Sequence, residues 1–147
     1  MGKYLADITP LRESPAFRRL WLGSAVSALG SQLTLVAVSL EIYRLTQDSL
    51  YVGLLSIFAL VPLVFGGLLG GSIADAHDRR TVALLASTVL WLTTAALALQ
   101  AWLELGNVWL LYALVAVQSG AQAINQPART AIIPVLVRKE LLPAANA

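Results

Sequence analysis

Residues 49–74, SLYVGLLSIFALVPLVFGGLLGGSIA, decide the fold, because they contain no Asp, Glu, Lys or Arg. A helix needs about 20 predominantly apolar residues to cross the hydrocarbon core of a bilayer, and this run is longer than that. A buried helix of a soluble domain is normally shorter. The run therefore predicts a transmembrane helix.

Three more uncharged apolar runs, at residues 20–40, 81–103 and 105–128, predict three further spans. The chain as a whole is 58% hydrophobic and only 12% charged, which is far from the composition of a soluble domain. Short connections force consecutive helices to run antiparallel beside one another. We therefore expect an all-α membrane protein with four antiparallel transmembrane helices.

The basic residues predict the orientation of these helices. Lys and Arg are enriched on the cytoplasmic side of membrane proteins, and here only Arg44 falls on the other side. Residues 1–19 and 129–147 are accordingly expected in the cytoplasm, and the chain in the inner (plasma) membrane. The basic residues form no long run, so no nucleic-acid partner is expected. Those on the predicted cytoplasmic side are Lys3, Arg12, Arg18, Arg19, Arg79, Arg80, Arg129, Arg138 and Lys139.

The residues that usually hold metals or perform catalysis are scarce. The chain has no cysteine and a single histidine, His77, which leaves little to bind a metal ion. No grouping of His, Ser or carboxylate residues forms a plausible catalytic site. We therefore expect no enzyme activity, no metal and no cofactor.

The connection between the second and third spans, GSIADAHDRR at residues 71–80, combines a glycine, an acid and two arginines. Asp75 can pair with an arginine, and such an ion pair at a membrane face can break when helices move apart. The simpler interpretation is that Arg79 and Arg80 fix the topology and that Asp75 caps the third helix.

This connection resembles the loop between helices 2 and 3 of the major facilitator superfamily, Gly-x-x-x-Asp-x-x-Gly-Arg-Arg/Lys. Gly71, Asp75, Arg79 and Arg80 match the pattern, and Asp78 stands where the second glycine is usual. The segments PARTAIIPVLV (residues 127–137) and LLPAANA (residues 141–147) resemble the enterobactin-exporter-like branch of that superfamily.

The resemblance implies a fold of twelve helices in two halves, of which this chain supplies helices 1 to 4, with residues 129–147 leading toward a fifth. The four matched residues would then form a cytoplasmic gate. The expected partners are the remaining helices, the lipid bilayer and a small-molecule substrate. In this superfamily, helices 1 and 4 line the central cavity and helix 3 is peripheral.

Polar side chains within the spans are candidates for lining such a cavity. Gln118, Gln122, Asn125 and Arg129 recur at intervals of four, three and four, so they share one face of the fourth helix. Gln32 lies near the middle of the first span. Amides in hydrocarbon require partners, and for Gln32 and Gln118 both helix contact and a water-filled cavity remain open interpretations.

Glu41 is the carboxylate closest to the interior of a span, which makes it the candidate coupling acid for proton-driven transport. Arg44 follows three residues later on the same helix face, and an exposed ion pair between the two is the favoured interpretation. Glycines 66 and 70, and 67 and 71, form two overlapping pairs of small residues typical of close helix contacts.

Together these features predict a secondary transporter that exports a small molecule, such as a siderophore or a drug, by alternating access. The alternative is a self-contained four-helix membrane scaffold or accessory subunit without transport activity.

Overall fold

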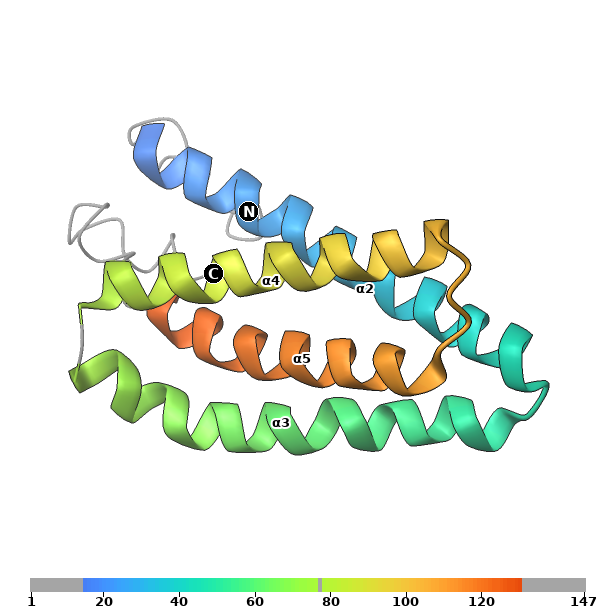
Figure 1. The fold of residues 1–147 in the computed structure, drawn as a ribbon. Helices are drawn as coiled ribbons and strands as arrows, with labels where there is room; N and C mark the ends of the chain where they lie inside the picture. Colours follow the sequence, from blue (N-terminus) through green and yellow to red (C-terminus); the bar gives the residue numbers. More distant parts are fainter. Residues whose placement is uncertain (1–14, 77, 131–147) are drawn as a thin grey trace, which may run out of the picture.

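The computed structural model describes residues 15–76 and 78–130, with the side chains of 71–76 and 79 left aside. Within these ranges the chain forms four α-helices and no strand, which confirms the predicted all-α fold (Figure 1). All four helices contain a segment long and apolar enough to cross a membrane. They are α2 (Pro15–Thr46), α3 (Ser49–Ala76), α4 (Arg79–Trp102) and α5 (Val108–Thr130).

The helix ends differ from the apolar runs for local reasons. Helix α2 begins at Pro15, and proline suits the first turn of a helix because its missing N–H needs no partner there. Helix α5 begins at Val108 rather than at residue 105. Gly106 takes a positive φ of 60° in the preceding turn, and the Asn107 side chain accepts a hydrogen bond from the Leu110 amide at 3.1 Å.

Helix α4 is capped by Asp78, so the interpretation that Asp75 caps it is wrong. The Asp78 carboxylate accepts hydrogen bonds from the Thr81 hydroxyl at 2.9 Å, the Thr81 amide at 3.3 Å and the Arg80 amide at 3.4 Å. These bonds satisfy amides that have no partner within the helix.

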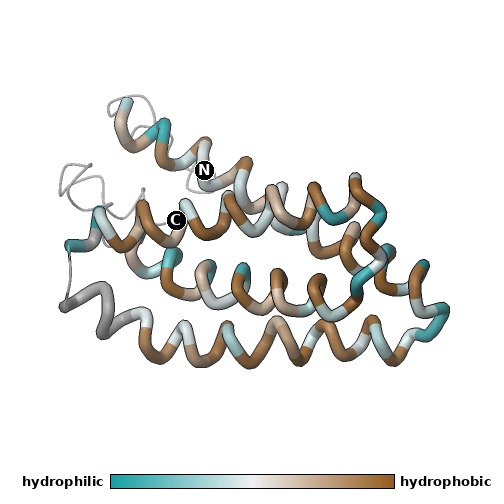
Figure 2. Tube along the Cα trace, in the orientation of Figure 1, coloured by the Kyte–Doolittle hydropathy of each residue, from teal (hydrophilic) through white to brown (hydrophobic). Residues whose placement is uncertain are grey.

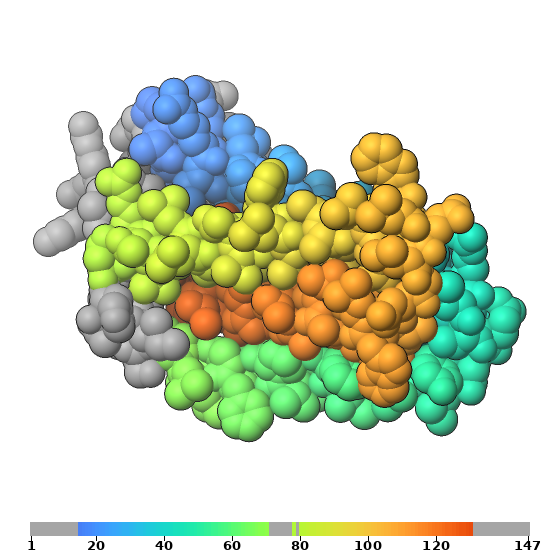
Figure 3. Space-filling view, viewed as in Figure 1, coloured from blue at the N-terminus to red at the C-terminus, as the bar shows by residue number. Residues whose placement is uncertain are grey.

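Helix α5 packs between α3 and α4, as Figure 3 shows on one face of the molecule. Its approach to α3 depends on glycine. A β-carbon built on Gly66 would lie 2.9 Å from the Gly120 carbonyl oxygen, and one built on Gly70 would lie 3.3 Å from the Ala123 carbonyl oxygen. A β-carbon on Gly67 would meet nothing within 4 Å. One glycine pair thus sets the contact between the two backbones.

Tyr112 of α5 anchors the larger of the two buried clusters found among the described residues, at the end of the bundle where α3 begins. Its ring stacks on Phe58 with centroids 4.7 Å apart, and its hydroxyl donates to the Tyr51 carbonyl at 2.6 Å. Val38 and Ile42 of α2 pack into the same cluster. The smaller cluster, Val82, Ala83 and Ala128, joins α4 to α5 at the opposite end.

Helix α2 lies at an oblique angle to the other three helices (Figure 1). It joins the Tyr112 cluster near its C-terminal end and diverges toward its N-terminal end. We call the latter end of the bundle, which carries Arg18, Arg19, Arg80 and Arg129, the basic end. Hydrophobic residues make up much of the four helices (Figure 2), and many of their large apolar side chains are exposed. Leu33 and Leu68, for example, are 72% and 74% exposed, as expected for surfaces that meet lipid or further helices.

Candidate functional site

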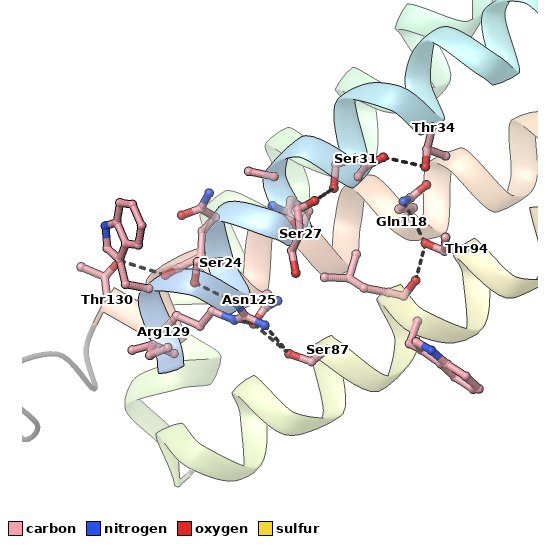
Figure 4. Close-up of a pocket in the computed structure, with 18 of the residues that line it drawn as sticks. Ser24, Ser27, Ser31, Thr34, Ser87, Thr94, Gln118, Asn125, Arg129 and Thr130 are labelled. Carbon is pink, nitrogen blue, oxygen red and sulfur yellow. Dashed lines mark hydrogen bonds between the residues drawn. The ribbon is translucent and has the colours of Figure 1, made fainter. Parts of the chain in front are cut away.

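A cavity of about 590 Å³ fills the space where α2 diverges from α4 and α5 (Figure 4). Its wall is mixed, with aromatic and aliphatic side chains beside many hydroxyls and amides. The apolar part includes Trp21 of α2 and Leu90 and Trp91 of α4. No Asp or Glu stands among the described residues that line it.

Arg129 joins the three helices at the basic end of this cavity. Its guanidinium donates from Nε to Asn125 Oδ1 at 3.1 Å, from Nη1 to Ser24 Oγ at 3.0 Å and from Nη2 to Ser87 Oγ at 3.1 Å (Figure 4). Ser24 belongs to α2, Ser87 to α4, and Asn125 to α5. A single side chain therefore bridges all three walls of the cavity.

Two of the α2 hydroxyls that line the cavity are already bonded to their own helix. Ser31 donates to the Ser27 carbonyl and Thr34 to the Gly30 carbonyl, both at 2.9 Å. Their oxygens can still accept a hydrogen bond from the cavity. They make this wall polar without requiring a partner there.

Two amides of α5 continue the polar wall toward the middle of the helix. Gln118 Nε2 donates to Thr94 Oγ1 at 3.4 Å, a long bond. Gln122 lines the cavity without a hydrogen-bond partner among the described residues. Because a polar amide without a partner is costly in hydrocarbon, this wall is suited to water or to a polar ligand.

The predicted amides separate into two groups. Gln118, Gln122 and Asn125 line the cavity, as their common helix face suggested, whereas Gln32 lies outside it with an exposed side chain. Their role in transport stays a prediction. The difference follows from helix geometry, since Gln32 is about 100° away from the face of its neighbour Ser31.

Two members of the Arg129 network were missed by the sequence reasoning. Ser24 extends the Ser27, Ser31 and Thr34 pattern backward at helical spacing, so the pattern itself could have identified it. Ser87 lies on the third span, and α4 thus contributes to the cavity wall. No local signal indicated Ser87, because its position depends on how α4 packs against α5.

Three of the four predicted gate residues, Gly71, Asp75 and Arg79, lie outside the part of the chain whose side chains are described. Arg80 is exposed at the start of α4. Next to it, hydrogen bonds from the Thr81 hydroxyl and then from the Arg80 amide lower the pKa of Asp78 below its ordinary value.

Glu41 and Arg44 lie at the opposite end of the bundle from Arg129, with Glu41 Oε2 3.6 Å from Arg44 Nη1. The Arg44 side chain is 73% exposed, so this is a surface ion pair of small energetic weight. Within the described ranges, no three His, Cys, Asp or Glu side chains group as a metal site would require.

Comparison with known proteins identifies the family to which this chain is similar. Residues 5–147 match the family described as transmembrane secretion effector. The enterobactin exporter EntS of Citrobacter koseri is 29% identical over 144 residues, which cover 98% of this chain and 35% of that protein. Macrolide efflux protein A of Streptococcus pyogenes is 25% identical over 126 residues, covering 86% of this chain and 31% of that protein. This chain thus spans about a third of these curated relatives. No solved structure matches it significantly.

Proposed function

We propose that this chain forms one wall of the substrate path of an efflux transporter, because it belongs to the transmembrane secretion effector family of the major facilitator superfamily. The observation that carries the proposal is the mixed cavity between α2, α4 and α5. A membrane-spanning bundle gains nothing in stability from a polar cavity, whereas a transporter needs one.

The cavity wall favours a small amphipathic substrate. Trp21, Leu90 and Trp91 offer apolar surface, and Gln118 and Gln122 offer amides on the same cavity. Two relatives are named for exporting enterobactin and macrolides. For this chain we propose a substrate of that general kind, a siderophore or a drug.

Alternating access would move α2 relative to the other helices. Among the described residues, α2 packs into the Tyr112 cluster near its C-terminal end and is bonded to Arg129 through Ser24 at the basic end. The cavity lies beside α2 between these two contacts. Gly71, Asp75, Arg79 and Arg80 would form the gate at the basic end, which we place in the cytoplasm together with both ends of the chain. The host membrane would be the inner membrane. Glu41, whose partly buried side chain pairs with the exposed Arg44, is the candidate acid for proton coupling.

Substitution of the cavity amides tests the proposal. Gln118→Leu and Gln122→Leu in the full-length protein should each lower the affinity for an exported dye or drug by roughly fivefold, since one lost hydrogen bond is worth about 1 kcal/mol. Efflux would be measured in cells against substrate concentration, at matched levels of protein in the membrane.

Gln32→Leu is the matched control, because Gln32 is the same residue type but lies outside the cavity. It should leave efflux unchanged. Equal efflux in all three variants and the wild type would contradict the proposed path, and absence of any transport in the wild type would favour a scaffold instead.

A further inference from the structure

Arg129 carries a positive charge into the cavity without a described counter-charge. Its three hydrogen-bond acceptors, Asn125, Ser24 and Ser87, are all neutral, and the side chain is partly buried. Neutral acceptors satisfy N–H groups, but they leave the charge itself uncompensated. A charge in a low-dielectric setting gains most from a partner of opposite sign.

The guanidinium also has hydrogen-bonding capacity to spare. It carries five N–H donors, and the three bonds to described residues use three of them. A planar guanidinium with open donors suits the oxygens of a carboxylate, phenolate or phosphate. The Ser24 hydroxyl, which accepts from Arg129 and donates to no described residue, can add a donor beside it.

We propose that Arg129 and Ser24 bind the anionic group of an amphipathic molecule whose apolar part lies along Trp21 and Trp91. These four residues line one cavity, so the charged and apolar contacts lie within reach of one small molecule. A soluble organic anion and an anionic lipid headgroup share this chemistry. If the occupant is the exported substrate, the inference rests on the proposed function and narrows the substrate to acids.

The test compares charged and uncharged ligands on the purified full-length protein in a neutral detergent. The soluble pair is 4-cyclohexylbutanoate and its amide. The lipid pair is dihexanoyl phosphatidylglycerol and dihexanoyl glycerol. Because Trp21 and Trp91 line the cavity, tryptophan fluorescence reports binding. Each member of a pair would be titrated at constant ionic strength.

The wild type should bind the anion of at least one pair about tenfold or more tightly than its uncharged counterpart, given the strength of hydrogen bonds to charged groups. Arg129→Gln should abolish this preference. Arg44→Gln is the matched control, because that arginine is exposed at the opposite end of the bundle, and it should retain the preference.

Arg129→Lys covers the case in which Arg129→Gln fails to fold, because it keeps the charge but loses the planar donors. It should retain a weaker preference for the anion. A preference for phosphatidylglycerol alone identifies a lipid site, and one that includes cyclohexylbutanoate identifies a soluble acid. Equal binding of charged and uncharged ligands by the wild type, or a preference that persists in Arg129→Gln, would overturn the inference.

This result is independent of the efflux assay. Efflux that depends on Gln118 and Gln122, without any preference for anions, would remove the anion site and leave the transport proposal intact. An anion preference that depends on Arg129, without efflux, would support the anion site and contradict the transport proposal.

Discussion

Asp78 illustrates how a departure from a family pattern can have its own structural logic. Glycine is usual at this position in the resembling motif, yet here the carboxylate caps α4 through Thr81 and the Arg80 amide. An acid at a helix N-terminus also interacts favourably with the helix dipole. The substitution therefore replaces a flexible turn residue with a helix cap.

This cap should make stability depend on pH. Hydrogen bonds lower the pKa of Asp78 in the folded protein below the ordinary value of 3.8, so the folded state binds fewer protons at this site. The stabilisation is present above the unfolded pKa and is lost as pH falls through the folded pKa. Asp78→Ala should lower the midpoint of thermal unfolding at pH 7, and the difference from wild type should shrink near pH 3.

Asp78→Asn is the matched control, because its amide oxygen can still accept from the helix amides but does not titrate. It should lie closer to wild type than the alanine variant at pH 7. A deficit of Asp78→Ala that stays constant from pH 7 to pH 3 would show that the carboxylate charge contributes nothing to the cap.

At the scale of elements, the contact between α3 and α5 depends on one glycine pair. Gly66→Ala would place a methyl group 2.9 Å from a backbone oxygen of α5, and backbone cannot move as a side chain can. Overpacking of this kind typically costs about 1–3 kcal/mol. The unfolding midpoint of the variant in detergent should fall accordingly.

Gly67→Ala provides the comparison within the same helix. Its β-carbon would meet no described atom within 4 Å, and alanine is the better helix former. This variant should be as stable as wild type or slightly more stable. Equal destabilisation of both variants would contradict the packing described for α3.

The helices themselves were predictable from sequence because hydropathy and the absence of charge are local properties of 49–74 and the other runs. The common face of Gln118, Gln122 and Asn125 was predictable for the same reason, since helix geometry is fixed. Arg129 was placed on that face, but its bonds to Ser24 and Ser87 were not predicted. They depend on the angle of α2 and the rotation of α4, which are set by packing between distant segments.

For the whole molecule, the unequal distribution of basic residues predicts which side of the membrane each end of the bundle faces. Residues 1–147 contain no cysteine, so each introduced cysteine would be the single one within this segment. Gln47→Cys and Glu104→Cys should react with a membrane-impermeant maleimide added to intact cells. Ala16→Cys, at the basic end, should react only after the membrane is permeabilised.

Expression would be checked by a permeant maleimide in each case. Labelling of Ala16→Cys in intact cells, with protection of the other two positions, would invert the proposed orientation and place the basic end of the bundle on the outer side.

The Arg129 bridge also determines how firmly α2 is held at the basic end. The bond to Ser24 is the described hydrogen bond between α2 and α5 there, and a bond to a charged group contributes about 1.5–3 kcal/mol. Converting one of two conformations almost completely into the other requires about 5.5 kcal/mol of differential binding. This single bond is therefore strong enough to bias the position of α2 at the basic end but too weak to fix it there alone, and a ligand that displaced Ser24 from the guanidinium would remove that bias.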